Sequence, residues 1–166
     1  YLIYNTGAVT ASVSMSNNNL SHTFNKSIAQ AGTINHIRNG GGTTTANLNI
    51  NNNTFASITH TTLSTTAHNF IYNTSSFLNN SINGNNWNNL AINSSGTFNF
   101  IYNSTSTQVA LNVNNNVITT GFTRLAAAAG TTYFYYSFII YFYYSFIKFK
   151  NKTSFLSFRY FLFYNI

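Results

Sequence analysis

Short alternations of apolar and polar residues, separated by clusters of asparagine, run from Leu48 to Ile118. Successive side chains of a β-strand point to opposite faces, so each alternation places its apolar residues on one face and its asparagines on the other. Asparagine is disfavoured inside strands but favoured at corners, because it tolerates the left-handed backbone conformation and forms hydrogen bonds with its own backbone. The pattern therefore predicts a series of short strands joined by asparagine-rich turns.

The same pattern recurs along the chain. Segments beginning at Leu48, Leu90 and Leu111 resemble one another, and their separations are multiples of about 21 residues. A step of this size is typical of one coil of a β-solenoid, which consists of a few short strands and the turns between them. We therefore expect an all-β body in which these apolar residues face a common interior: Leu48, Ile50, Ile71, Ile92, Leu111 and Val113.

A second repeat favours a different fold. The pentapeptide at residues 69–73, Asn-Phe-Ile-Tyr-Asn, recurs without change at residues 99–103. An antiparallel sheet with duplicated hairpins could produce this longer spacing. An antiparallel β-sandwich is therefore the alternative to the solenoid.

Residues 51–55, Asn-Asn-Asn-Thr-Phe, and residues 79–85, Asn-Asn-Ser-Ile-Asn-Gly-Asn, resemble coils of the right-handed parallel β-helix proteins. The resemblance covers about residues 42–120 and implies a β-solenoid. Many members of that group are polysaccharide lyases or hydrolases whose chemistry depends on acidic residues. This chain contains no Asp or Glu, so the resemblance assigns it no catalytic residue.

The length of 166 residues suits one domain with a substantial core. The formal charge of +7 does not indicate nucleic-acid binding by the body, because that part is nearly neutral. Its cations Lys26, Arg38 and Arg124 are scattered, and the other cations lie in the tail, where contact with a membrane is the competing interpretation. Composition divides the chain into a body rich in Asn, Ser and Thr (1–124), an aromatic apolar segment (125–147) and a basic aromatic tail (148–166).

The segment 125–147 is free of charged residues, and its length of about 23 residues could span a bilayer as a helix. Its tyrosines, however, are costly in the centre of a membrane, and its aromatic residues are strong strand formers. We therefore expect either contact with a membrane or a strand buried in the body or in a neighbouring subunit.

The absence of Asp and Glu removes paired-acid glycoside hydrolysis, aspartic proteolysis and the oxygen ligands of calcium and magnesium sites. Cysteine is also absent, so a zinc site would need three or four of the histidines His22, His36, His60 and His68 to converge. No local motif indicates such convergence. The sequence therefore predicts a chain that is not an enzyme and that holds no metal or cofactor.

Two groups of surface residues are candidates for binding. Trp87, which is flanked by asparagines, and the threonines Thr43 and Thr45 could form a face for a ligand, although a core position is the more ordinary one for a tryptophan. Eight asparagines precede the x-Ser/Thr pattern of glycosylation sites: Asn19, Asn25, Asn52, Asn73, Asn79, Asn93, Asn103 and Asn151.

Two classes of function are compatible with these features. The first is an extracellular or cell-surface structural or adhesive protein, such as a surface-layer, filament or adhesin subunit, which self-associates or contacts neighbouring subunits and glycans. Its C-terminal part could tether it to a membrane. The second is a solenoid module that binds carbohydrate or ice. A regular row of threonines on a flat face would favour the second class, and strand exchange between chains would favour the first.

Overall fold

The computed structural model describes residues 2–24, 32–104, 109–126 and 130–137, and these form strands and turns without a helix. Sheet A contains β1 (Ile3–Asn5), β5 (Ile34–Asn39), β9 (His68–Asn73), β12 (Phe98–Asn103) and β15 (Thr132–Ser137). Sheet B contains β2 (Ser12–Ser14), β6 (Asn47–Asn49), β10 (Asn79–Ser81) and β13 (Ala110–Asn112). Sheet C contains β3 (Asn19–Leu20), β4 (Thr23–Phe24), β7 (Thr54–Ala56), β8 (Thr59–Ser64), β11 (Asn86–Ser94) and β14 (Val117–Arg124).

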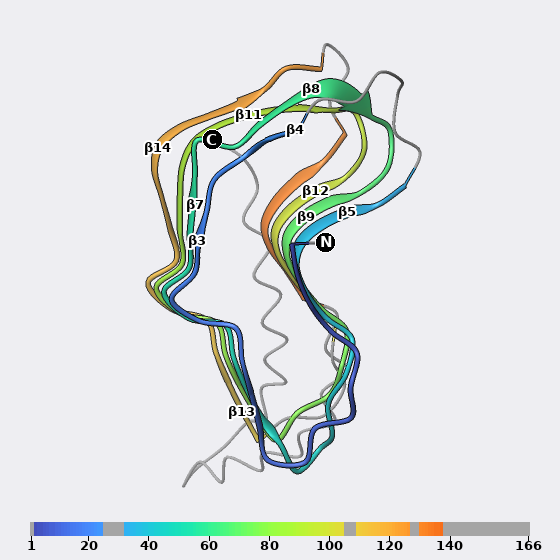
Figure 1. The fold of residues 1–166 in the computed structure, drawn as a ribbon, viewed down its shortest axis with the longest axis vertical. Coiled ribbons are helices and arrows are strands. Elements are labelled where there is room, and N and C mark those ends of the chain that lie inside the picture. Colours follow the sequence, from blue (N-terminus) through green and yellow to red (C-terminus); the bar gives the residue numbers. More distant parts are fainter. Residues whose placement is uncertain (1, 25–31, 105–108, 127–129, 138–166) are drawn as a thin grey trace, which may run out of the picture.

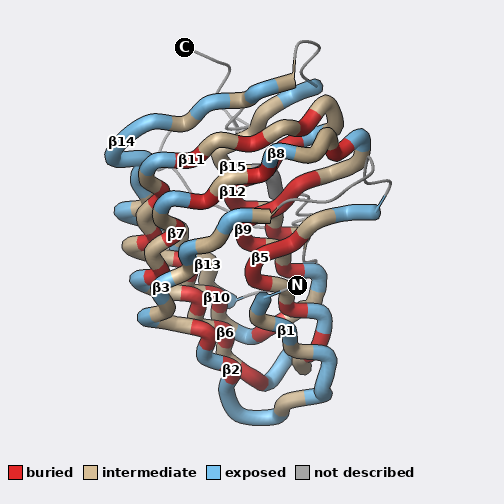
Figure 2. Tube along the Cα trace, turned by 45° about the horizontal axis from the view of Figure 1, so that its top comes forward, coloured by how far each residue is buried: buried red, intermediate tan, exposed pale blue. Residues whose placement is uncertain are grey.

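The strands form a β-solenoid whose turns are about 32 residues apart. The chain passes from sheet A to sheet B and then to sheet C, and each strand pairs in parallel with its equivalents in the coils before and after it. Figure 1 shows the successive coils overlying one another, and Figure 2 shows them stacked with the buried residues on the inside. The expected all-β solenoid is confirmed.

The coil length inferred from the leucine-led segments was wrong. Leu48 pairs with Asn80 in the next coil, and Asn80 pairs with Leu111 in the coil after that. Leu48 and Leu111 are therefore equivalent positions two coils apart, while Leu90 lies in sheet C. Ile71 belongs to sheet A, so it does not stack on Ile50 as the shorter step required.

The repeated pentapeptide marks one true coil. Asn69 pairs with Asn99 and Tyr72 with Tyr102, in parallel, within the neighbouring strands β9 and β12 of sheet A. The antiparallel alternative is therefore wrong, because identical segments stack on one another instead of forming duplicated hairpins.

The corner between sheets B and C repeats one backbone conformation. One residue in each coil has a positive φ there, and these residues are Asn17 (61°), Asn52 (55°), Gly84 (65°) and Asn115 (55°). Asparagine and glycine are the residues that adopt this left-handed conformation at least cost, which explains why asparagines cluster between the strands. The expectation that asparagines form the corners is confirmed.

Ladders of asparagine side chains join the coils inside the solenoid. At the end of sheet A, Asn39 Nδ2 donates to Asn73 Oδ1 at 2.8 Å, and Asn73 Nδ2 donates to Asn103 Oδ1 at 2.7 Å. Beside the corner, Asn53 Nδ2 donates to Asn85 Oδ1 at 2.9 Å. All five of these side chains are fully buried. Within the ladder, each amide oxygen or nitrogen that faces a neighbouring coil replaces water with an identical amide, and only the Nδ2 atom of Asn103, at the end of its row, has no partner among the described residues.

The core is a column of apolar residues between the three sheets. Phe55 stacks on Trp87 at 5.4 Å between ring centroids, and Ile37, Ile71 and Ile101 lie in register along sheet A. The predicted interior residues Leu48, Ile50, Ile71 and Ile92 are fully buried, whereas Leu111 and Val113 are partly buried in the fourth coil. The buried apolar residues are Val13, Met15, Ile37, Ala46, Leu48, Ile50, Phe55, Ile58, Phe70, Ile71, Phe77, Ile82, Trp87, Leu90, Ile92, Phe98, Phe100 and Ile101.

The solenoid extends past residue 124, because β15 pairs in parallel with β12. This pairing places a strand of the segment 125–147 on the body, where the described side chains of residues 132–135 are partly buried. Residues 138–147 and the tail 148–166 lie outside the described residues. Within the described ranges, there is no helix with the length and apolar character needed to cross a membrane.

The asparagine ladder predicts a large effect for Asn85→Ala. Asn85 Oδ1 accepts hydrogen bonds from the backbone N–H and the side chain of Asn53, and its Nδ2 donates to Ile50 O and Asn116 Oδ1. An unsatisfied buried polar group costs about 1–3 kcal/mol, so we expect the free energy of unfolding in urea to fall by about 3 kcal/mol or more. The control is Asn112→Ala, at an exposed strand position, with an expected effect within about 0.5 kcal/mol. Equal effects at the two positions would contradict the ladder's role.

The unpaired, buried amide of Asn80 predicts that replacing this residue stabilises the protein. It is fully buried between Leu48 and Leu111 in sheet B, and among the described residues neither its amide oxygen nor its amide nitrogen has a hydrogen-bond partner. Asn80→Leu removes this unpaired amide from an apolar stack, so we expect a gain of about 1–3 kcal/mol in the free energy of unfolding. Asn79→Leu, next to it, should give no gain, because it breaks a hydrogen bond to Asn47. A lower melting temperature for Asn80→Leu would show that the amide is satisfied.

Candidate functional site

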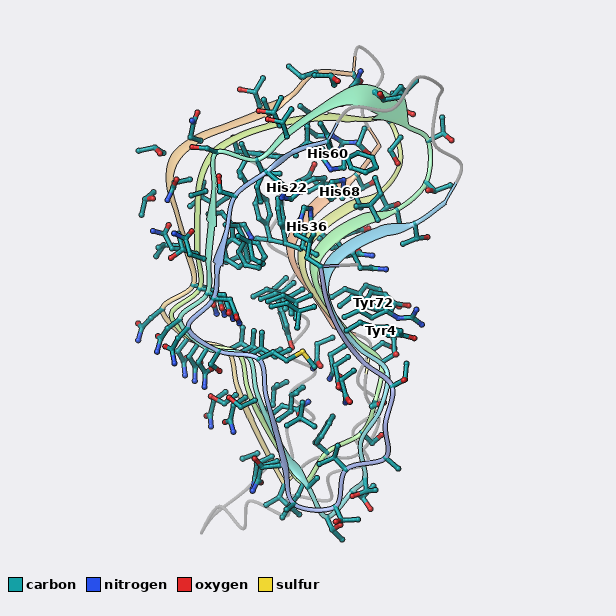
Figure 3. The ribbon with its side chains drawn as sticks, in the orientation of Figure 1. Tyr4, His22, His36, His60, His68 and Tyr72 are labelled. Atoms are coloured by element: carbon teal, nitrogen blue, oxygen red, sulfur yellow. The ribbon has the colours of Figure 1, made fainter. Side chains whose placement is uncertain are left out.

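An open groove with a volume of about 400 Å³ lies on sheet A. Figure 3 shows that Tyr72 points away from the interior of the solenoid, on the concave outer side of this sheet. The groove is lined by Thr33, Ala67, Asn69, Tyr72, Thr97, Asn99, Tyr102 and Tyr133. Because these residues come from successive coils, the groove runs along the direction in which the coils stack.

An amide row forms part of the groove. Asn69 Nδ2 donates to Asn35 Oδ1 at 2.7 Å, and Asn99 Nδ2 donates to Asn69 Oδ1 at 2.6 Å. In the next coil the equivalent position is Tyr133, so the amide ladder stops at Asn99. The Oδ1 atom of Asn99 is buried and has no hydrogen-bond partner among the described residues. The row therefore ends in a buried acceptor just beneath the surface of the groove.

A tyrosine column forms a second row. The rings of Tyr72 and Tyr102 stack at 4.8 Å between centroids with an interplanar angle of 18°. Below them, the guanidinium carbon of Arg38 lies 5.0 Å from the ring centroid of Tyr4 and 5.8 Å from that of Tyr72. Tyr72 and Tyr102 thus use ring faces for contact with each other, and the column presents ring edges to the groove.

The chemistry of the groove is that of hydrogen bonding. Its lining consists of threonine hydroxyls, asparagine amides, tyrosines and one alanine. Amides and hydroxyls both donate and accept hydrogen bonds. The described lining contains no histidine, lysine or carboxylate, so its polar groups are amides, hydroxyls and phenols.

The residues predicted as a ligand face do not line this groove. Trp87 has no exposed surface and packs in the core against Phe55. Its predicted place in a surface ligand face is therefore wrong. Thr43 and Thr45 lie between β5 and β6, where their hydroxyls are 3.0 Å apart and Thr43 Oγ1 donates to Val9 O. The sequence did contain a feature that marks the groove, because the repeated pentapeptide supplies an asparagine and a tyrosine of the lining from each of two coils.

The predicted glycosylation sites differ in burial. Asn19 and Asn52 are exposed, and Asn79 and Asn93 are partly buried. Asn73 and Asn103 are fully buried in the ladder of sheet A, where a glycan has no room. Asn25 and Asn151 lie outside the described residues.

All four histidines converge inside the solenoid. Figure 3 shows His22, His36, His60 and His68 together between sheets A and C. One ring nitrogen from each of His22, His36 and His60 lies within 4.8 Å of the others, and the Nε2 atoms of His36 and His68 are 2.9 Å apart. A zinc site made of histidines requires this convergence, which no sequence motif predicted.

Burial favours the neutral form of His22, His36 and His68 by lowering the pKa of each imidazole. It lowers the pKa of His22, and it lowers the pKa of His36 and His68 well below the ordinary value of 6.5. The neighbouring imidazoles reinforce the pKa shift at His36 and His68, because each would repel a second positive charge. A neutral imidazole is the form that binds metal ions.

Comparisons of the chain with protein-family models, with curated proteins and with solved structures find no match. The fold itself defines the class as a β-solenoid.

The burial of the asparagines predicts which of the glycosylation sites carry glycans. If the chain is made in a glycosylating cell, we expect the folded protein to carry glycans at Asn19 or Asn52 and none at Asn73 or Asn103, because the latter amides are bonded inside the solenoid. Peptide mapping by mass spectrometry, with and without glycosidase, measures the occupancy. A glycan on Asn73 in protein that retains its folded spectrum contradicts the ladder.

Proposed function

We propose that this chain is a non-enzymatic adhesive β-solenoid, which binds a hydroxyl-rich polymer such as a polysaccharide in the groove of sheet A. The observation that carries the proposal is the lining of the groove by repeated amide, hydroxyl and tyrosine groups. Adjacent parallel strands are about 4.8 Å apart, so similar hydrogen-bonding groups recur at short, regular intervals along the groove. A regular row of this kind suits a linear polymer better than a compact molecule.

The same groove favours carbohydrate over ice as the ligand. It is hollowed, and asparagine and tyrosine contribute most of its lining, whereas an ice-binding surface would be a flat array of threonines. Extracellular or cell-surface location, association with neighbouring subunits and membrane contact through 125–147 belong to the same hypothesis. They stay predictions from the sequence.

Substitutions that remove hydroxyl groups without removing rings test the groove. The test variant combines Tyr72→Phe, Tyr102→Phe and Thr97→Val, which keeps the stacked rings in place. The matched control combines Thr10→Val, Thr120→Val and Thr123→Val, three exposed positions that do not line the groove. Binding is measured by depletion of the protein from solution on a panel of insoluble polysaccharides, namely cellulose, chitin, xylan and mannan.

We expect the unmodified chain to bind at least one polysaccharide of the panel and the test variant to bind it at least about tenfold more weakly. A hydrogen bond contributes about 0.5–1.5 kcal/mol and each factor of ten in affinity corresponds to about 1.4 kcal/mol, so the loss of two bonds is sufficient. The control should bind like the unmodified chain. Absence of binding to the whole panel, or equal weakening in both variants, would overturn the proposal.

A further inference from the structure

The histidines of β8 and β9 occupy positions that the stacking of the coils otherwise fills with apolar residues. His60 lies in register with Phe24 in the coil before and with Ile92 in the coil after. His68 lies in register with Ile34 and Phe98. Histidine thus replaces an apolar residue at these interior positions, and the replacements meet at one place.

The cluster joins three coils and two walls of the solenoid. His22 precedes β4 in the first coil, His36 in β5 and His60 in β8 belong to the second coil, and His68 in β9 belongs to the third. His36 and His68 come from sheet A, and His60 comes from sheet C opposite them. Their ring centroids are 4.9–6.1 Å apart. The convergence therefore depends on the coiled fold and is not local in sequence.

Aromatic rings enclose the cluster. Phe70 stacks on His36 at 4.5 Å, Phe24 on His60 at 4.6 Å and Phe98 on His68 at 5.0 Å between centroids. Such walls hold each imidazole plane in one orientation, as the outer shell of a metal centre does. They offer no hydrogen-bonding groups, so the ring nitrogens must find partners within the cluster.

The imidazoles of sheet A are incompletely satisfied. His36 and His68 contact each other through their Nε2 atoms, and the Nδ1 atom of each is buried without a hydrogen-bond partner in the described part of the chain. His36 is 1% and His68 0% exposed. Buried unsatisfied polar groups are rare in folded proteins, and an ion bound in the native protein often accounts for them.

We propose that His22, His36, His60 and His68 form a binding site for one divalent transition metal ion, of the class that includes Zn²⁺ and Cu²⁺. Imidazole nitrogen is a preferred ligand of these ions, whereas Ca²⁺ and Mg²⁺ require oxygen ligands. Bond lengths of about 2.0–2.1 Å place the nitrogens of a tetrahedral site about 3.4 Å apart. The Nε2 atoms of His36 and His68 are 2.9 Å apart, and the nitrogens of the group formed with His22 and His60 lie within 4.8 Å of one another. These separations bracket the required spacing, so the histidines are placed to close around one ion.

The ion would enter from the side of His22. That residue is only half-buried, whereas His60 is 2% exposed. The chain has no Asp or Glu to offset the charge of the ion, so hydroxide or another anion from solution accompanies it on this side. A bound ion links the first three coils, and its role is to fasten this part of the solenoid. The site lies in the interior and is separate from the groove.

Zinc alone is the probe for this site. The full-length chain, without an affinity tag, is stripped of metal with EDTA, and Zn²⁺ binding is measured by equilibrium dialysis. We expect one Zn²⁺ per chain with a Kd below about 1 µM, together with a higher melting temperature when zinc is present. Because the chain contains no Asp, Glu or Cys, the histidines are its principal zinc ligands.

Two variants and one control assign the ligands. His22→Gln and His60→Gln should each weaken zinc binding at least about tenfold and reduce the zinc-dependent rise in melting temperature. Thr23→Gln, an exposed neighbour of His22, should change neither. If His60→Gln fails to fold, His22→Gln remains decisive, because a half-buried residue tolerates the exchange. X-ray absorption of the unmodified chain should show three or four nitrogen ligands at about 2.0–2.1 Å. No zinc binding, unchanged affinity in the folded variants, or oxygen ligands only would overturn the proposal.

Discussion

Each coil of this protein binds the next through backbone hydrogen bonds between parallel strands and through the amides of stacked asparagines. The ladder from Asn5 through Asn39 and Asn73 to Asn103 places one amide per coil at the same point of the wall. Asn39 and Asn73 each satisfy a donor and an acceptor by lying between identical amides in the coils before and after. The ladders therefore fix the register of the coils, because a shift by one residue would leave a row of buried amides unpaired.

This constraint explains why like residues gather in rows on the walls of the solenoid. On the outside of sheet A it produces the amide row and the tyrosine column of the groove, which are repetitive because the coils are. On the inside it produces the apolar column. The histidine cluster is the opposite case, since its members are not in register with one another and come together across the interior. A periodic ligand suits the first arrangement, and a single ion suits the second.

The sequence predicted the class of fold and the role of its corners, but not the length of a coil. Alternation of apolar residues and asparagine is a local property, so strands and corners could be inferred. The period depends on which copies stack. The separation of Leu48 from Leu111 equals either three of the shorter steps or two true coils. The similar segment that begins at Leu90 fits only the shorter step, so it favoured the wrong period. The pentapeptide repeat had the correct spacing. An exact match of five residues is less often a coincidence than matches of isolated apolar residues, so it was the better guide to the period.

The two candidate sites differed in how far the sequence could reveal them. Asn69, Tyr72, Asn99 and Tyr102 of the groove lie inside an exact repeat, and a period of one coil is enough to place them side by side. The histidines form no motif, because they are scattered along the chain and meet only when three coils have closed. Once the coil length is known, however, His60 and His68 stand out as polar residues in apolar columns. Several polar residues that meet at stacked interior positions are therefore a better indicator of a site in a solenoid than any spacing along the chain, whereas a single one, such as Asn80, is not.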